Sequence, residues 1–218
     1  MTDIIPPSPS AEDYAKDGAG KPLIPDVSDP LALFNTWMGE AREAEPNDSN
    51  AMSLATVDSF GRPDVRVVLL KGVSEKGFDF YTNLGSAKGE QLKANPVAAI
   101  GFHWKSLRRQ VRLRGVIERV SDEEADTYFA SRARISRLSA IASDQSRPLP
   151  ARSVFEERIA ALEVEYDGRD DIPRPEDWGG FRLVPEQIEF WQDQAFRTHD
   201  RLKFTLKEGV WTTERLYP

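Results

Sequence analysis

The spacing of apolar positions changes along the chain and predicts a helix followed by a series of strands. Asp29 and Pro30 are typical of a helix start, and apolar residues recur after them at helical spacing to about Glu43. From Met52 onward, apolar and polar residues alternate with the period of a strand. The alternation predicts strands at residues 53–57, 65–73, 77–82, 97–104 and 110–120, the first two joined as a hairpin by a turn at 58–61.

Helix signals return between residues 121 and 166. Ser121 with Glu124, and Ser153 with Glu156, have the spacing of capping boxes, so each pair predicts the start of a helix. The second of these helices carries a stripe of apolar residues that we interpret as core: Val154, Phe155, Ile159, Leu162 and Tyr166. A short helix is also expected at 86–94, and closing strands at 180–183, 187–192, 201–207 and 210–216.

These elements predict a mainly β fold with inserted helices. Short strands joined by hairpins, without regular alternation of strands and helices, favour an antiparallel barrel over a doubly wound sheet. We expect residues 28–218 to form a single domain. Residues 1–27 are rich in Pro, Gly, Ser and Asp, which predicts a flexible tail or a strap.

Composition narrows the possible functions. The 218 residues include 29 Lys and Arg against 36 Asp and Glu, and the net charge of -7 argues against nonspecific nucleic-acid binding. The chain has no Cys and two His, which excludes disulfides, thiolate metal sites and a histidine-rich metal centre. The N-terminus has no signal-peptide pattern and no segment approaches the roughly 20 apolar residues that cross a bilayer, so we expect a cytoplasmic protein without membrane contact. Any anion site must therefore be a local cluster of cations.

The usual glycine-rich phosphate loops, nucleophile elbow and zinc-helix motifs are absent from the sequence. Cations and hydroxyls instead gather where strands and helices begin or end. Arg66 and Lys71 bracket an apolar run, but strict alternation puts them on opposite faces, so one shared site needs a bulge and a solvated edge strand is an equal alternative. On a later strand Gln110, Arg112 and Arg114 share one face; a wet exterior is favoured for the arginines, and Gln110 is undecided.

Two further segments could bind phosphate. Residues 81–88 run from a strand into a helix N-terminus, where Ser86 and Lys88 favour an anion, although Ser86 could equally be only an N-cap. Tyr128, Arg132 and Ser136 are spaced four apart, so a continuous helix would align a phenol, a guanidinium and a hydroxyl. Chance polar spacing on a surface helix would look the same.

The last candidate segment lies near the C-terminus. Arg197, His199 and Arg201 alternate, so on a strand they would face one way and form a cationic stripe beside Trp191. A merely exposed strand rarely contains such a group.

Taken in order, these segments closely resemble the pyridoxine (pyridoxamine) 5′-phosphate oxidase family. The resemblance covers nearly all of residues 29–218 and rests on several motifs in a fixed order: RVVLLK at 66–71, FYTNLGS at 80–86, SRARIS at 131–136, QS at 145–146, IEFW at 188–191 and RTHDR at 197–201. Each motif alone is weak, and the ordered set is specific.

The resemblance implies an FMN-binding split β-barrel of antiparallel Greek-key type that works as a homodimer with FMN at the subunit interface. The C-terminal segment would take part in dimerisation. The implied FMN contacts within one subunit are Arg66, Val67, Val68, Leu69, Lys71, Tyr81, Thr82, Lys88 and Gln110. The partner subunit would add Gln145, Ser146, Trp191 and Arg201. One departure is Ala87, which stands where the family usually has an arginine, and this could weaken the hold on the FMN phosphate.

The resemblance also implies the reaction. Pyridoxamine 5′-phosphate or pyridoxine 5′-phosphate would lose hydride from C4′ to flavin N5, and O2 would reoxidise the flavin, which yields pyridoxal 5′-phosphate and hydrogen peroxide, with ammonia from the amine. The implied substrate contacts are Lys71, Tyr128, Arg132 and Ser136 at the phosphate, with Arg197 and His199 over the ring as the catalytic pair. A related flavin oxidase of secondary metabolism and a non-catalytic flavin- or haem-binding split-barrel module are the alternatives. The preference between the two vitamin B6 phosphates and any secondary product site stay open.

Overall fold

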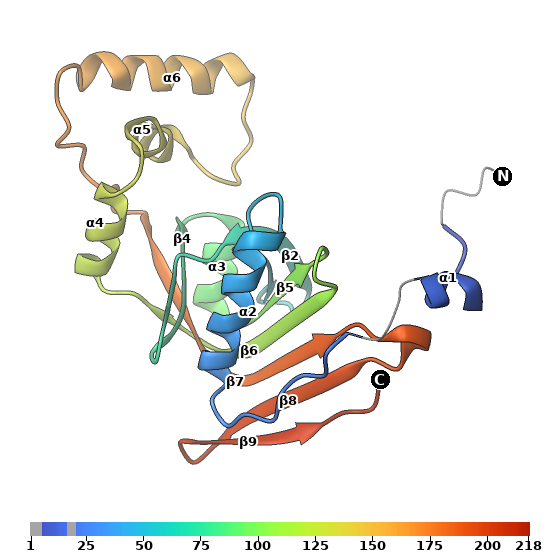
Figure 1. The fold of residues 1–218 in the computed structure, drawn as a ribbon. Coiled ribbons are helices and arrows are strands. Elements are labelled where there is room, and N and C mark those ends of the chain that lie inside the picture. The colour runs from blue at the N-terminus through green and yellow to red at the C-terminus, as the bar shows by residue number, and fades with distance from the viewer. Residues whose placement is uncertain (1–5, 17–20) are drawn as a thin grey trace. The chain divides into compact units, whose positions relative to one another are not determined.

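The computed structural model describes residues 6–16 and 21–218 (Figure 1). The chain divides into two compact units. The first comprises Met1–Ser49, Gly101–Leu113 and Glu186–Pro218, and the second comprises Asn50–Ile100 and Arg114–Pro185. Each unit is therefore built from segments that are distant in the sequence.

The strands form the antiparallel framework that the apolar alternation predicts. Hydrogen bonds connect them in the order β2-β1-β5-β6-β7-β4-β3, with β8 paired to β7 and β9 paired to β8. The strands are β1 (Ala51–Val57), β2 (Pro63–Leu69), β3 (Gly72–Ser74), β4 (Gly77–Asn83), β5 (Val97–Trp104), β6 (Arg109–Arg119), β7 (Trp178–Gln192), β8 (Asp200–Lys207) and β9 (Val210–Arg215). The predicted hairpin is confirmed, since β1 and β2 pair antiparallel with Ala51 opposite Leu69. The predicted strands 180–183 and 187–192 are one continuous strand, β7, because no turn interrupts residues 178–192.

The prediction of a single strand at residues 65–73 is wrong. The structure divides it into β2 and β3, with Leu70 and Lys71 outside both strands. Leu70 is buried, and its N–H donates to the carbonyl of Asn50, whereas the N–H of Lys71 donates to the carbonyl of Asp79. The chain thus leaves the hairpin and joins β4 at this point. This change of pairing partner releases Lys71 from the strict alternation of β2.

Helix starts follow the predicted caps in three cases. Asp29 caps α2 (Pro30–Ala44), Ser86 caps α3 (Ala87–Ala94), and Ser121 with Glu124 forms a complete capping box at α4 (Asp122–Ala130). Each cap gives a side-chain oxygen to backbone N–H groups that have no partner within the helix.

The predicted start of the helix after residue 150 is wrong. Helix α6 (Arg152–Glu165) begins before Ser153, and no side chain caps it. The predicted apolar stripe is the less exposed face of the helix: Tyr166 belongs to the core of the second unit, Leu162 packs against that core, and the other three residues are half-buried. The helix packs on α5 (Arg134–Ala142), and Figure 1 shows the two helices near each other.

Two parts of the N-terminal segment, helix α1 and Ile24, contact other residues of the first unit. Helix α1 (Ala11–Lys16) lies against the 3₁₀ turn η1 (Ala195–Arg197), with the rings of Tyr14 and Phe196 4.9 Å apart. Ile24 is 2% exposed, and its N–H donates to Asp200, which fits a strap for this part of the chain. Residues 1–5 and 17–20 of the predicted tail lie outside the described residues.

Each unit has its own apolar core. Aromatic contacts in the first unit join side chains from α2, β5, β7 and β8: Phe34, Trp37, Phe102, Trp104, Phe190 and Phe204. In the second unit a cluster forms around Phe129, Leu138, Tyr166, Ile172 and Trp178. Among the described residues, no helix is long and apolar enough to cross a membrane.

Candidate active site

The second unit contains a cavity of 780 Å³ lined by strand β2, strand β4 and the helices that follow them. Four cations line it: Arg66, Lys71, Lys88 and Arg132. Its described lining contains no carboxylate, although the whole chain has a net charge of -7. Because like charges gathered in one cavity repel one another, this arrangement is suited to an anionic ligand.

One group of cations lies at the N-terminus of α3. Lys88 Nζ donates to Gln145 Oε1 at 2.7 Å, to Thr82 Oγ1 at 3.1 Å and to Ser86 Oγ at 3.3 Å. All three acceptors are neutral. Burial lowers the pKa of Lys88, and the charge of nearby Arg66 lowers it further. A phosphate at this point would offset both effects and would face the backbone N–H groups at the helix start.

Arg66 is held in place by neighbours on β1 and α3. Its Nη1 donates to Thr56 Oγ1 at 2.6 Å and to the carbonyl of Leu54 at 3.1 Å, and its Nη2 donates to Gln91 Oε1 at 3.0 Å. Asp64, which does not line the cavity, lies 2.6 Å from Nη2. These contacts restrict the guanidinium to one orientation, so little side-chain entropy remains to be lost when a ligand binds.

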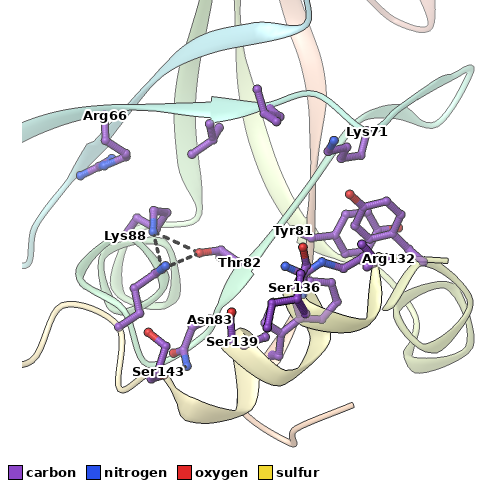
Figure 2. A pocket seen from close by; sticks show the side chains of 18 of the residues that line it. Arg66, Lys71, Tyr81, Thr82, Asn83, Lys88, Arg132, Ser136, Ser139 and Ser143 are labelled. Carbon is purple, nitrogen blue, oxygen red and sulfur yellow. Dashed lines mark hydrogen bonds between the residues drawn. The ribbon is translucent and has the colours of Figure 1, made fainter. Parts of the chain in front are cut away.

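The break between β2 and β3 decides the question left open for Arg66 and Lys71. Both side chains line the same cavity, and Figure 2 shows them at its two ends. Strict alternation would have separated them, whereas the chain segment at Leu70 and Lys71 lies outside both strands. Val67, Val68 and Leu69 line the cavity between them.

The second group of cations surrounds Arg132. The continuous helix predicted through Tyr128, Arg132 and Ser136 is wrong, because α4 ends at Ala130 and α5 begins at Arg134. The three side chains nevertheless line the same cavity, since the break turns the chain around the site. Figure 2 shows Arg132 and Ser136 close together on the side where Lys71 lies.

Arg132 carries an unused hydrogen-bond donor. Its Nη1 is buried and has no partner in the structure. Burial also lowers the pKa of Arg132, and its guanidinium lies over the ring of Trp178 at 5.0 Å. A buried donor without an acceptor costs free energy, so this atom points to a ligand oxygen.

Stacked aromatic rings form one wall of the cavity. The ring of Tyr81 lies 4.0 Å from that of Tyr128 and 5.6 Å from that of Trp178, centroid to centroid. Gly180 faces Tyr81 across the β4–β7 pair, and a Cβ there would lie 2.7 Å from the tyrosine ring. Burial is the main cause that raises the pKa of Tyr81. The absent side chain at Gly180 therefore allows the ring to lie flat against the strand.

The remaining predicted site residues belong to the first unit: Gln110, Trp191, Arg197, His199 and Arg201. The predicted alternation on one strand is wrong for Arg197 and His199. Arg197 is the last residue of η1 and has a φ of 62°, His199 precedes β8, and only Arg201 is a strand residue. Gln110 is half-buried on β6, with the exposed Arg112 and Arg114 on the same face.

A buried carboxylate fixes the position of one of these residues of the first unit, Arg201. Glu189 is 8% exposed, and its Oε1 accepts a hydrogen bond from Arg201 Nε at 2.9 Å. Its Oε2 accepts from Arg112. The ring of Trp191 lies 4.5 Å from that of His199. Glu189 thus holds Arg201 in one position on β8.

Gln145 and Ser146 differ in their placement. The resemblance implied that both come from a partner subunit, but Gln145 of the same chain lines the cavity and bonds to Lys88 and Thr82. Ser146 is exposed and has a φ of 71°. The turn into this left-handed conformation directly follows the glutamine that reaches the cavity.

Sequence reasoning missed several lining residues, among them Asn83, Ser139, Ser143, Phe155 and Trp178. Trp178 stands directly after a Pro-rich loop, and a large aromatic residue at the start of a strand was an available signal. The serines of α5 gave no such signal in the sequence, because polar residues on a short helix usually face water.

The fold and the cavity define an antiparallel split-barrel protein with one pocket whose two groups of cations are suited to anionic ligands. Comparison with known proteins narrows this class. Residues 38–166 match the family model described as pyridoxamine 5′-phosphate oxidase, and residues 178–218 match the model described as pyridoxine 5′-phosphate oxidase C-terminal dimerisation region. The chain belongs to the pyridoxamine 5′-phosphate oxidase family.

Relatives and solved structures agree with this assignment. The chain is 66% identical over 216 residues to a pyridoxine/pyridoxamine 5′-phosphate oxidase of Hyphomonas neptunium, covering 99% of this chain and 98% of the relative. It is 59% identical over 197 residues to the protein of the same name from Gluconobacter oxydans, covering 90% and 98%. The structure of PhzG from Burkholderia lata, solved with tetrahydrophenazine-1-carboxylic acid, superposes with a TM-score of 0.86 at 29% identity and covers 92% of this chain and 100% of that one. An FMN-binding protein of Nostoc punctiforme shares the fold, with a TM-score of 0.71 at 19% identity, covering 88% of this chain and 100% of that one.

Proposed function

We propose that this chain oxidises pyridoxamine 5′-phosphate and pyridoxine 5′-phosphate to pyridoxal 5′-phosphate, with FMN as cofactor and O2 as the final electron acceptor. The observation that carries the proposal is one cavity with two separate groups of cations and no carboxylate among its described lining residues. A flavin phosphate and a substrate phosphate need two such groups. Relatives that carry this activity in their names share 59–66% sequence identity over at least 90% of this chain, which supports the same conclusion.

The two groups of cations differ in their chemistry, and this difference assigns the two phosphates. Lys88, Arg66 and the start of α3 form the end suited to the FMN phosphate, with Thr82 and Gln145 as neutral neighbours. The flavin site has no arginine at position 87, so Lys88 and the helix N–H groups carry more of the binding there. FMN also has the segment 66–69 and Tyr81 beside it in this assignment.

The Arg132 end is suited to the substrate phosphate. The unpaired Nη1 of Arg132 offers a charge-assisted hydrogen bond, and Ser136, Tyr128 and Lys71 add a hydroxyl, a phenol and an ammonium group. The separation of this group from Lys88 directs the substrate phosphate away from the flavin phosphate. The substrate ring is thereby held in one orientation, which is the main catalytic task of the protein.

FMN, when bound, supplies the redox chemistry by accepting hydride from C4′ of the substrate and passing two electrons to O2, which forms hydrogen peroxide. The side chains of this chain bind, orient and shield the reactants. Arg197 and His199 are the catalytic pair in this proposal: Arg197 places the substrate ring, and His199 receives a proton from the substrate amine or hydroxyl. The imine formed from the amine substrate takes up water and releases ammonia.

The active form in this proposal is a homodimer with FMN at the interface. The match of residues 178–218 to a dimerisation region supports a dimer. Trp191 and Arg201 of the partner subunit then complete the flavin site, while Gln145 acts within its own chain. Ser146 stays an expected flavin contact of the partner subunit. A cytoplasmic location is also part of this proposal, and the lack of cysteine supports it.

The proposal is tested with the purified chain and one matched pair of variants. The protein should bind FMN with a visible flavin spectrum, and pyridoxamine 5′-phosphate in air should yield pyridoxal 5′-phosphate and hydrogen peroxide in equal amounts. Lys88→Met should weaken FMN binding at least tenfold, since a charge-assisted contact contributes about 1.5–3 kcal/mol. Lys93→Met, on the exposed last turn of the same helix, should leave it unchanged.

Two results would overturn the assignment. A protein that binds FMN and oxidises a cyclic amine or acid without phosphate, but not the vitamin B6 phosphates, would be an oxidase of the alternative kind that the likeness to PhzG suggests. A protein that binds flavin and turns over neither class would be a non-catalytic binding module.

A further inference from the structure

His199 lies in a small cavity of the first unit that is distinct from the one around Lys88. This cavity measures 450 Å³, and its titratable or charged lining residues are Asp13, Tyr14, Arg108, Asp193, Arg197 and His199. His199 is half-buried, with its ring beside that of Trp191. A histidine in such a position can exchange protons with a ligand and still be influenced by its neighbours.

One ring nitrogen of His199 has two competing neighbours. The backbone N–H of Gln194 donates a hydrogen bond to Nδ1 at 3.2 Å, and Oδ1 of Asp193 lies 3.1 Å from the same nitrogen. If Nδ1 has no proton, it accepts from the N–H of Gln194 and the neutral ring carries its proton on Nε2. If Nδ1 is protonated, it donates to Asp193 and Nε2 becomes the free acceptor.

Asp193 is itself fixed in place. Its N–H donates to the carbonyl of Arg108 at 3.0 Å, and its Oδ2 lies 3.3 Å from Arg108 Nη1. Oδ1 is thereby directed to the histidine. A hydrogen bond to a carboxylate is roughly twice as strong as one between neutral groups, which favours the pairing with Asp193 over that with Gln194.

We propose that Asp193 is a positioning residue that keeps the proton of His199 on Nδ1, so that Nε2 accepts a proton from the substrate. The inference rests on the proposed function, in which His199 belongs to the catalytic pair. In the step that Asp193 supports, the N–H or O–H bond of the substrate amine or hydroxyl breaks and an Nε2–H bond forms. The imidazole becomes imidazolium, and the carboxylate of Asp193 balances its charge.

The other charged groups in this cavity act in opposite directions. Arg108 and Arg197 disfavour an imidazolium by repulsion, whereas Asp13 favours it. Asp193 is distinguished from Asp13 by direct contact with Nδ1. Replacing either aspartate by asparagine removes the same charge from the same cavity, so Asp13→Asn is a matched control.

The first test is nitrogen NMR of the holoenzyme labelled with ¹⁵N-histidine. The chain has two histidines, so the His103→Gln variant assigns the signals of His199 without ambiguity. In the unsubstituted protein the neutral ring should carry its proton on Nδ1. Asp193→Asn should move the population to the Nε2–H form, and Asp13→Asn should not. An Nε2–H ring in the unsubstituted protein would overturn the inference.

The second test uses kcat/KM in a double-mutant cycle. Asp193→Asn should lower kcat/KM about tenfold to 100-fold, because the imidazolium loses its counter-ion. In a His199→Asn background, Asp193→Asn should cause no further loss. A full additional loss there would show that Asp193 acts elsewhere and would refute the proposal. The NMR result does not depend on turnover, so a protein inactive on vitamin B6 phosphates would refute the proposed function without deciding the tautomer.

Discussion

Replacing Arg132 by methionine should affect ligand binding and protein stability in opposite directions. The side chain of Arg132 has a buried Nη1 with no partner and lies over the rings of Trp178 and Phe129. Methionine keeps a similar length and removes the charge. The variant therefore separates what the guanidinium does for a ligand from what its stem does for the core.

The expected changes in KM and in the unfolding free energy follow from these contacts. One charge-assisted hydrogen bond contributes about 1.5–3 kcal/mol, so KM for pyridoxamine 5′-phosphate should rise roughly tenfold to 150-fold. In the free protein, the unsatisfied donor costs about 1–3 kcal/mol, and the cation–π contacts offset about 0.5–2 kcal/mol of that cost. With the middle of each range, removing both should raise the unfolding free energy by about 1 kcal/mol, which corresponds to about 2–4 °C in Tm for a chain of this size.

The assay combines steady-state kinetics with thermal unfolding. Both measurements use the protein with FMN bound, and the unfolding is measured without substrate. Arg134→Met is the control, because the guanidinium of Arg134 donates to the carbonyls of Tyr166 and Arg169 and does not line the cavity. This control should lose stability and keep its KM. Pyridoxamine, which lacks the phosphate, should be oxidised equally poorly by the unsubstituted protein and by Arg132→Met.

The reasoning fails if Arg132→Met lowers Tm while KM stays unchanged. That outcome would mean that the guanidinium stabilises the fold and that its Nη1 is not directed at a ligand. An equal rise in KM for Arg134→Met would also count against it, since any cation near α5 would then have the same effect.

Three further substitutions test other parts of the structure. Glu189→Gln should weaken FMN binding about tenfold, measured by flavin fluorescence, because Arg201 loses its buried counter-ion; unchanged affinity would remove Arg201 from the flavin site. The pKa of Glu124 is lowered to about 2 by hydrogen bonds from its capping box and an arginine, so its contribution to stability is present above pH 4.5 and is lost as the pH falls toward 2. Glu124→Gln should flatten the dependence of the unfolding free energy on pH in that range, and an unaltered slope would contradict this. Gly180→Ala should cost about 1–3 kcal/mol and raise KM, because the new Cβ would meet a tyrosine ring at 2.7 Å, whereas Gly101→Ala has open space and should show no effect on KM.

Local signals in the sequence account for most of the elements. The caps at Asp29, Ser86 and Ser121 are confirmed because each depends only on neighbouring backbone groups. The hairpin of β1 and β2 is confirmed for the same reason. The apolar stripe of α6 faces inward as expected, but most of it is only half-buried, because helical spacing does not say how much of a stripe another element covers.

Several residues of the predicted site line one cavity, but the path of the chain that brings them together differs from the predicted one. Tyr128, Arg132 and Ser136 line one cavity, yet a break between two helices brings them there and not a continuous helix. Arg66 and Lys71 share that cavity because a strand ends between them. In both cases the motif identified the residues and the chain path supplied the arrangement.

The sequence by itself determined the strand and helix periods, the caps and which side chains carry charge, since these depend on residues close along the chain. Only the tertiary structure decided which of those charges meet. Thr82 and Gln145 are 63 positions apart and share a hydrogen bond, and Asp79 and Arg182 are 103 apart and form a bidentate pair. Such contacts depend on strand register and on where the chain breaks and turns, and no local pattern specifies these, because they follow from the packing of the whole unit.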